Sequence, residues 1–212
     1  MRLPAPPLLL VTDRRQARGD IADIAEAAFS AGCRWLSLRE KDLPPRDQAA
    51  LLRKLLARAQ KYQATVTLHG DAKLARDARA DGVHLAAGSD AAEARRVLGK
   101  DALIGLSIHG ADEARSVDAR LVNYVVAGPV FETPSKPGYG PALGPEGLAL
   151  IAKASAVPVI AIGGINPENA AACRAAGAAG IAVMGGVMRA KNPGEAAAQL
   201  IGALTVPHPR PR

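Results

Sequence analysis

The sequence contains few aromatic residues, which limits the ways in which it could bind nucleic acid. Aromatic residues make up 3% of the 212 residues, so nucleobases have few rings on which to stack. Lys and Arg exceed Asp and Glu by 27 to 20, for a net charge of +7, but the basic residues are scattered along the chain. We therefore predict no nucleic-acid partner, and a small anionic substrate accounts for part of the positive charge.

Cysteines and long apolar runs are equally scarce. Cys33 and Cys173 lie far apart and have no metal-ligand spacing, which predicts two buried thiols in a reducing compartment. The apolar run at residues 8–11 is too short for a signal peptide or a membrane span. We expect a cytoplasmic protein with no membrane partner.

The composition is typical of one globular domain. Hydrophobic residues make up 49% of the chain and charged residues 22%, which is enough apolar material for a sizeable core of Ala, Val, Leu and Ile. We predict a single domain over residues 1–204. Residues 205–212, which include Arg210 and Arg212, are predicted to form a disordered basic tail.

Short apolar runs alternate with stretches of helical length along the whole chain. The predicted strands are Leu8–Thr12, Trp35–Arg39, Thr65–His69, Gly82–Leu85, Leu103–Ile108, Tyr124–Val130, Val157–Ile162 and Gly180–Met184. The clearest predicted helices are Ile21–Ala31, Arg46–Lys61, Ala91–Leu98, Pro145–Ala154, Pro167–Ala176 and Pro193–Leu204. Continuously apolar strands are typical of parallel sheets buried on both faces. Eight such units predict a (β/α)₈ TIM barrel.

An open, doubly wound sheet is the alternative architecture. Its glycine-rich fingerprint is missing, because residues 12–15 after the first strand read Thr-Asp-Arg-Arg. The barrel is therefore the prediction, and the carboxyl ends of its strands should form the active face.

Two glycine pairs follow the seventh and eighth predicted strands. Gly163-Gly164 and Gly185-Gly186 stand where barrels commonly hold a phosphate on backbone N–H groups. Arg39, Lys41 and Lys136 follow other strands and could supply cations to an anion. These positions predict a phosphate-binding pocket.

Histidines suggest where protons could move. His109 follows Ser107 at the end of the fifth strand and could exchange a proton near neutral pH. His84 lies inside a strand and is predicted to be structural, and His69 is left without a role.

Five motifs, in order and in register with the strands, carry a family resemblance. They are Leu38-Arg39-Glu40-Lys41, Asp81-Gly82-Val83-His84-Leu85, Ser107-Ile108-His109, Gly128-Pro129-Val130-Phe131 and Ala161-Ile162-Gly163-Gly164-Ile165-Asn166-Pro167. With them the chain resembles the thiamine-phosphate-synthase and TenI superfamily over residues 8–204. Synthase members join a pyrimidine pyrophosphate to a thiazole phosphate with Mg²⁺, whereas TenI members, as thiazole tautomerases, aromatise carboxythiazole phosphate and need no cofactor.

The resemblance holds best on the thiazole side of the implied pocket. It implies that Thr133 and Ser135 hold the thiazole carboxylate. It also implies that the backbone of Gly164, Met184 and Gly185 holds the phosphate.

On the pyrophosphate side the chain departs from the synthase pattern. Ser37 replaces a glutamine, and Gly70 precedes Asp71 where the family has Asn-Asp. Near Ser89 the family has a second acidic metal ligand, which this chain lacks. Arg39, Lys41, Asp71, Ser107 and Lys136 remain on this side. Asp71 is a Mg²⁺ ligand only in the synthase interpretation, where Asp90 is the candidate second carboxylate.

We therefore expect a TenI-like thiazole tautomerase in which His109 or Glu132 transfers protons. The alternatives are a Mg²⁺-dependent thiamine-phosphate synthase and a non-catalytic regulator that binds a phosphate ligand. An aldolase has little support, since no predicted strand contains a lysine. The partner is a small thiazole phosphate, and the sequence also allows a homodimer.

Overall fold

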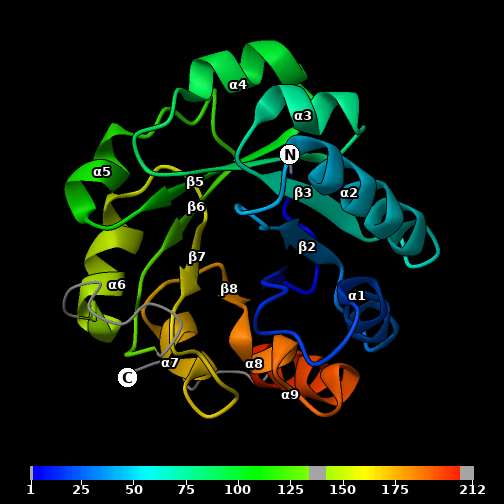
Figure 1. Ribbon diagram of the computed structural model, residues 1–212. Helices are drawn as coiled ribbons and strands as arrows, with labels where there is room; N and C mark the ends of the chain where they lie inside the picture. Colours follow the sequence, from blue (N-terminus) through cyan, green and yellow to red (C-terminus); the bar gives the residue numbers. More distant parts are fainter. Residues whose placement is uncertain (1, 134–141, 206–212) are drawn as a thin grey trace.

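A computed structural model of the chain describes residues 2–133 and 142–205. Within these residues eight parallel strands close into a barrel in the order β1 to β8, and the helices surround it in chain order (Figure 1). The strands are β1 (Leu8–Val11), β2 (Trp35–Leu38), β3 (Thr65–His69), β4 (Gly82–Leu85), β5 (Leu103–Ile108), β6 (Tyr124–Ala127), β7 (Val159–Ile162) and β8 (Gly180–Val183). The predicted single-domain (β/α)₈ barrel is confirmed.

The helices alternate with the strands and pack outside them. They are α1 (Ile21–Ser30), α2 (Pro45–Gln60), α3 (Ala72–Asp77), α4 (Ala91–Leu98), α5 (Ala111–Ser116), α6 (Gly144–Ala154), α7 (Ala170–Ala175), α8 (Gly185–Met188) and α9 (Pro193–Thr205). Three of these were not among the predicted helices, namely α3, α5 and α8. They span six, six and four residues, which is too short to display the apolar periodicity of a helix.

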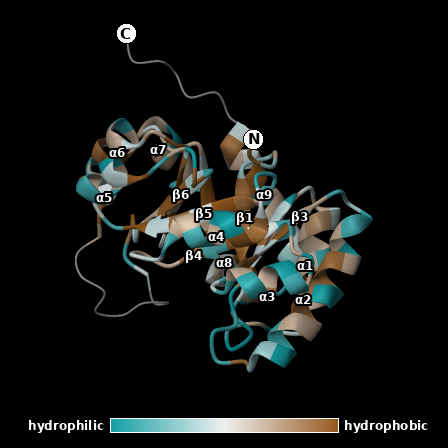
Figure 2. Ribbon diagram, turned by 90° about the horizontal axis from the view of Figure 1, so that it is seen from above, coloured by the Kyte–Doolittle hydropathy of each residue, from teal (hydrophilic) through white to brown (hydrophobic). Residues whose placement is uncertain are grey.

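Successive residues of each strand face opposite sides of the barrel wall. In β1, Leu8 and Leu10 belong to the core between strands and helices, whereas Leu9 and Val11 belong to the cluster that contains Trp35. Figure 2 accordingly shows hydrophobic strands and hydrophilic outer faces on α1, α2 and α3. Burial on both faces explains why the strands read as continuous apolar runs.

Several element bounds differ from the predicted ones for local reasons. Strand β7 begins at Val159 rather than Val157, because Pro158 has no N–H to donate to the ladder. Helix α7 begins at Ala170 rather than Pro167. There the Asn166 side chain accepts the N–H groups of Glu168 and Asn169, both at 3.0 Å, and so holds this segment as a turn.

The two cysteines are buried and free, as predicted. Burial raises the pKa of the Cys33 thiol to about 11, which keeps it protonated at neutral pH. None of the helices in the described ranges has the length and hydropathy needed to cross a membrane.

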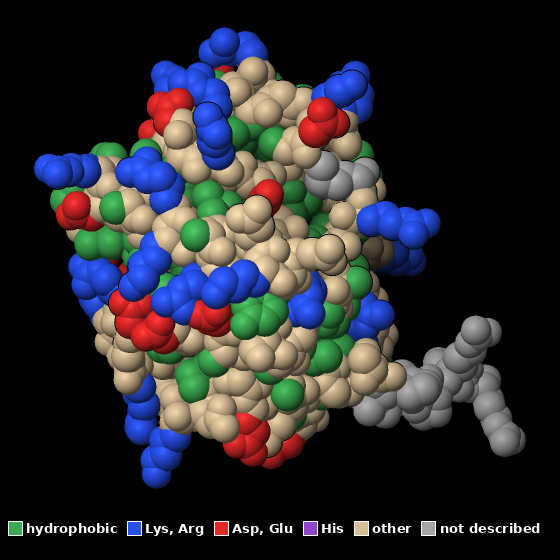
Figure 3. Space-filling view, turned by 90° about the vertical axis from the view of Figure 1, so that its right-hand side faces the viewer, with side chains coloured by type: hydrophobic (Ala, Val, Ile, Leu, Met, Phe, Trp, Pro, Cys, Tyr) green, Lys and Arg blue, Asp and Glu red, His purple; other side chains and the backbone are tan. Residues whose placement is uncertain are grey.

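Charges of both signs alternate on the face that carries α1 and α2 (Figure 3). Lys54 lies 2.9 Å from Asp20, and Arg58 lies 3.4 Å from Asp23, so basic side chains of α2 are paired with acidic ones of the α1 region. The predicted tail at 205–212 lies outside the described residues, apart from Thr205, which ends α9.

Candidate active site

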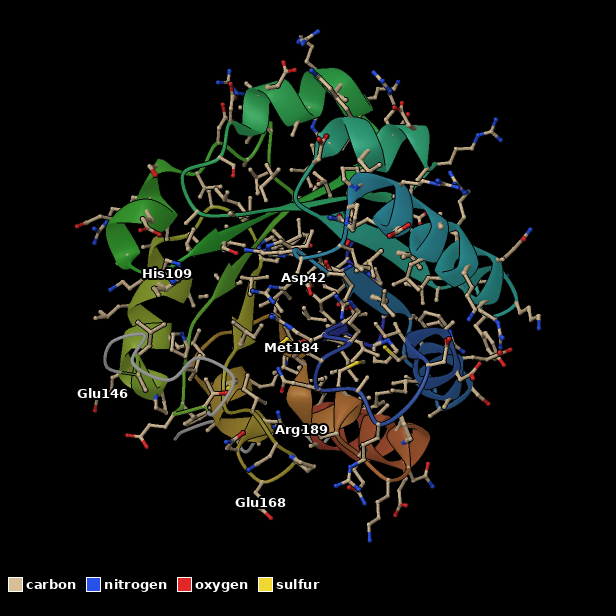
Figure 4. All side chains as sticks on the ribbon, in the orientation of Figure 1. Asp42, His109, Glu146, Glu168, Met184 and Arg189 are labelled. Atoms are coloured by element: carbon tan, nitrogen blue, oxygen red, sulfur yellow. The ribbon has the colours of Figure 1, made fainter. Side chains whose placement is uncertain are left out.

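A pocket of about 480 Å³ opens at the carboxyl ends of the strands. Eight residues predicted from the sequence line it: Arg39, Ser107, His109, Glu132, Thr133, Gly164, Met184 and Gly185. In Figure 4, Met184 lies near the middle of the barrel opening, Arg189 beside α8 and His109 on the side of α5. A separate cavity of about 570 Å³ opens around the starts of β3 and β5, and none of the predicted residues lines it.

Four other predicted residues have different positions. Lys41 and Asp71 follow β2 and β3 at the same end of the barrel but do not line the pocket. Burial and the neighbouring Arg39 lower the pKa of Lys41. Ser135 and Lys136 lie outside the described residues.

The turn after β7 brings backbone close to backbone at Gly164. This residue has φ of +64°, and a Cβ there would lie 2.4 Å from the Glu132 carbonyl oxygen. The Asn169 side chain donates to the Gly164 carbonyl at 2.9 Å and so fixes the turn. Glycine is required here both by its conformation and by the approach of the loop after β6.

Gly185 begins α8 beneath an arginine that the sequence analysis missed. A Cβ on Gly185 would lie 2.2 Å from Arg189 Nη1, so the guanidinium covers this glycine. Arg189 also donates to Gln16 and lines the pocket. Its spacing of four residues from Gly185 places it on the same helical face, which is the signal that could have identified it.

Arg39 is held by a buried carboxylate on the next residue. Glu40 is 3% exposed and accepts the Thr12 hydroxyl at 2.7 Å and the Arg14 N–H at 3.1 Å. Thr12 Oγ1 in turn accepts the Arg39 N–H at 2.9 Å. Burial raises the pKa of Glu40, although these hydrogen bonds favour the carboxylate. Glu40 therefore connects the ends of β1 and β2 and fixes the backbone of Arg39.

His109 is oriented by the loop that follows β6. Its Nδ1 lies 2.9 Å from the Gly128 carbonyl oxygen, which can only accept. Nδ1 must therefore carry the hydrogen, and in the neutral ring Nε2 is the nitrogen that can take up a proton. The His109 N–H donates to Glu113 at 2.7 Å, which holds the residue at the start of α5.

His84 also lines the pocket, in addition to the structural position in β4 that was predicted for it. Its Nε2 lies 2.9 Å from Ser107 Oγ. Ser37, on β2, also lines the pocket, and its Oγ is buried and has no hydrogen-bond partner within the described residues. A buried hydroxyl without a partner costs about 1–3 kcal/mol, so a polar ligand atom would fit at Ser37.

The buried His84 predicts a loss of stability in acid. Burial, followed by the charges of Lys41 and Arg39, lowers the pKa of His84 to about 3, whereas the unfolded value is near 6.5. Below pH 6.5 the unfolded chain binds a proton that the folded chain takes up only near pH 3. The free energy of unfolding should therefore fall by about 2–3 kcal/mol from this group between pH 7 and pH 4.5.

Urea unfolding of the unmodified chain and of His84→Asn at these two pH values measures this contribution. The variant should show the smaller loss between pH 7 and pH 4.5. An equal loss in both proteins would contradict the assignment of a neutral, buried His84.

The residues of the pocket do not form a ready metal site. The described part of the chain has no group of three or more His, Cys, Asp or Glu side chains that could hold a metal ion. Asp71 Oδ1 accepts the N–H groups of Lys73 and Leu74 as the N-cap of α3, and Asp90 caps α4 in the same way. Both candidate carboxylates thus have a structural role, and the Mg²⁺ implied by the synthase resemblance does not fit these residues as they are arranged.

Comparison with known proteins places these features in one family. The model of the family described as thiamine monophosphate synthase matches residues 8–187. A thiamine-phosphate synthase of Roseiflexus sp. is 39% identical over 198 residues, which cover 92% of this chain and 83% of the relative. A thiamine-phosphate synthase of Mycobacterium tuberculosis is 37% identical over 215 residues, which cover 96% of this chain and 97% of the relative.

A solved structure agrees with both sequence comparisons. Thiamine phosphate pyrophosphorylase from Pyrococcus furiosus superposes with a TM-score of 0.83 at 29% identity, covering 93% of this chain and 94% of that chain. The family match spans all eight strands and most of α8, including every predicted residue that lines the pocket. The chain therefore belongs to the thiamine monophosphate synthase family.

Proposed function

We propose that this chain is a thiamine-phosphate synthase that joins a pyrimidine pyrophosphate to a thiazole phosphate. The observation that carries the proposal is the identity of 37–39% to relatives of that name over nearly the whole chain. These relatives support the synthase better than the tautomerase that we expected from the sequence. The synthase is therefore the first candidate function and the tautomerase the second.

The pocket offers separate places for the two phosphorylated ends. The glycine turns at Gly164 and Gly185, with Arg189 above the second, are suited to the phosphate of the thiazole. Arg39 lines the pocket at the end of β2, on the other side of β1 from β8, and has Lys41 near it, so these cations are suited to pyrophosphate. Thr133 and Ser107 supply hydroxyl groups to the same pocket.

In this proposal the thiazole nitrogen forms a bond to the pyrimidine methylene carbon, and the carbon–oxygen bond to pyrophosphate breaks. Negative charge then accumulates on the departing pyrophosphate, where Arg39 and Lys41 stabilise it. The phosphate turns hold the thiazole in position, so that the two reacting atoms meet in a defined orientation. No step is assigned to Mg²⁺, because the carboxylates of the chain are not arranged to hold it.

The geometry of His109 favours the second candidate, a thiazole tautomerase. That reaction needs a group that removes a proton from one ring carbon and returns one to the exocyclic carbon. The hydrogen bond from Nδ1 to Gly128 presents Nε2 as a proton acceptor in the same pocket, and Glu132 lies on the same rim. This reaction needs neither pyrophosphate nor a metal ion.

Product analysis tests the proposal. The purified chain, given both substrates and Mg²⁺, should form thiamine phosphate and pyrophosphate in equal amounts. Binding of the thiazole phosphate without any product would instead support the non-catalytic regulator.

Two glycine variants test the phosphate site. Gly185→Ala should displace the Arg189 guanidinium, because the new Cβ would lie 2.2 Å from Nη1, and should weaken thiazole phosphate binding by about tenfold or more. Gly202→Ala in α9 is the control, since a Cβ there meets nothing within 4 Å and Gly202 does not line the pocket. Calorimetric titration with thiazole phosphate measures both affinities, and equal values would remove this role from Gly185.

A further inference from the structure

The side chain of Arg189 is held at the pocket by an amide from the loop after β1. Its Nη1 donates to Gln16 Oε1, and the same Nη1 is the atom nearest to the Cβ position of Gly185. Arg189 is exposed to solvent, so without a partner its long side chain would sample many rotamers. The Gln16 amide therefore fixes the place of the guanidinium before any ligand binds.

Asp13 holds Gln16 in turn. Gln16 Nε2 donates to Asp13 Oδ2 at 2.6 Å, and Asp13 is 8% exposed. The Arg15 N–H donates to Asp13 Oδ1 and the Gln16 N–H donates to the Asp13 carbonyl oxygen, both at 3.1 Å. An aspartate that accepts the N–H two residues further on stabilises a turn. This turn brings the Gln16 side chain back to the Asp13 carboxylate.

The loop that carries both residues is attached to α8 by its backbone as well. The Arg18 N–H donates to the Met188 carbonyl oxygen at 3.0 Å. Arg189 follows Met188 directly, so the backbone bond and the bond from Arg189 to Gln16 join the same two segments. The distance between Gln16 and Arg189 is therefore set by the fold.

The partners at its two ends fix the orientation of the Gln16 amide. An arginine can only donate hydrogen bonds, and an ionised carboxylate can only accept them. Oε1 must therefore face Arg189, and Nε2 must face Asp13. The reversed amide would place donor against donor at Arg189 and acceptor against acceptor at Asp13.

The partner of Arg189 is a neutral oxygen rather than a carboxylate. None of the ion pairs in the described ranges involves Arg189. The negative charge of Asp13 acts on Arg189 only through the intervening amide. A carboxylate in direct contact would compete with an anionic ligand for the guanidinium, whereas the amide holds it and leaves its charge to the ligand.

We propose that Gln16 and Asp13 are positioning residues for Arg189 in the phosphate site. Asp13 sets the orientation of the Gln16 amide, and Gln16 holds the guanidinium where the ligand phosphate binds. Neither residue has to touch the phosphate in this role. The inference rests on the proposed function for the phosphate site at Gly164 and Gly185, and it assigns the loop after β1 to that site.

Asp13→Asn distinguishes positioning from a simple effect of charge. The new side-chain oxygen can keep the Arg15 N–H, so the new amide N–H₂ faces Gln16 and turns the Gln16 amide around. Gln16 Nε2 then opposes Arg189, and the affinity for thiazole phosphate should fall about threefold to tenfold, the cost of ordering one long side chain on binding. Loss of a negative charge near an anion would by itself raise the affinity.

Calorimetric titration with thiazole phosphate measures the sign of this change. Asp77→Asn is the control for charge, since Asp77 is exposed in α3 and does not line the pocket, and it should leave the affinity unchanged. A higher affinity in Asp13→Asn than in the unmodified chain would overturn the proposal.

Gln16→Ala removes the acceptor of Arg189 and should lower the affinity by a similar factor. In the Gln16→Ala background, Asp13→Asn should raise the affinity slightly, because only the effect of charge remains. In the synthase reaction both single variants should raise KM for thiazole phosphate and leave kcat and KM for pyrimidine pyrophosphate unchanged. An equal loss from Asp13→Asn in both backgrounds would contradict the coupling through Gln16.

A measurement without ligand separates this inference from the proposed function. Nitrogen-15 NMR should show slow rotation of the Arg189 guanidinium, assigned with Arg189→Lys, in the unmodified chain and in Asp77→Asn. Rotation should be fast in Asp13→Asn and Gln16→Ala. Equal rotation in all of these proteins would overturn the positioning role, whereas the expected rotation in a chain that binds no thiazole phosphate would contradict the proposed phosphate site instead.

Discussion

Glu40→Ala should lower the free energy of unfolding by about 3 kcal/mol, because it removes a buried acceptor that has several donors. The Thr12 hydroxyl at 2.7 Å and the Arg14 N–H at 3.1 Å would both lose their partner. Arg39 would lose its fixed backbone as well, since its N–H is held by Thr12. Denaturant unfolding should therefore show a large loss of stability, accompanied by weaker binding of pyrophosphate.

Two further variants separate the effect of losing a buried hydrogen-bond acceptor at Glu40 from the effect of losing a negative charge. Glu40→Gln keeps one acceptor oxygen but brings an amide N–H₂ against the Arg14 N–H, so its loss should be intermediate, at about 1–2 kcal/mol. Glu146→Ala, at an exposed position in the first turn of α6, should cost no more than about 1 kcal/mol. Equal losses in Glu40→Ala and Glu146→Ala would contradict the proposed connection between β1 and β2.

If the chain acts as the second candidate, the tautomerase, His109→Ala should lower the rate of carboxythiazole phosphate aromatisation by about 10²-fold or more, the usual contribution of a positioned acid–base group. The reason is the tautomer fixed by the Gly128 carbonyl at 2.9 Å, which makes Nε2 the proton acceptor in the pocket. Aromatisation can be followed by the ultraviolet absorbance of the product.

His109→Asn is the matched variant, since its side-chain amide can still donate toward the Gly128 carbonyl. It should keep the stability of the unmodified chain but lose the aromatisation activity, which separates proton transfer by His109 from its structural hydrogen bond. A full rate in His109→Ala would remove His109 from this reaction, and Glu132→Gln would then test the other candidate.

The strands could be predicted from the sequence because burial on both faces produces recognisable apolar runs. A strand buried on both faces must be continuously apolar, and all eight predicted strands overlap the observed ones. The short helices have no comparable sequence pattern, since α3 has six residues and depends on Asp71 as its cap rather than on an apolar stripe. Asp71 itself shows the difficulty, because a carboxylate after a strand can be a metal ligand or an N-cap, and the sequence does not distinguish them.

The site could be predicted in part for a similar reason. The residues at strand ends, such as Ser107 and Gly164, are placed by the barrel topology alone. Arg189 and Glu40 were missed because their roles depend on where a helix turn and a neighbouring loop bring them. The position of His84 in β4 was predicted, but its contact with Ser107 on the neighbouring strand β5 is shown only by the three-dimensional structure.

The most direct test of the proposed function compares two rates in one preparation of the chain. One is the formation of thiamine phosphate from pyrimidine pyrophosphate and thiazole phosphate with Mg²⁺, and the other is the aromatisation of carboxythiazole phosphate with EDTA. The synthase proposal predicts that thiamine phosphate forms with one pyrophosphate released per product. Aromatisation that continues in EDTA, with no thiamine phosphate formed under any condition, would contradict the synthase and establish the tautomerase in its place.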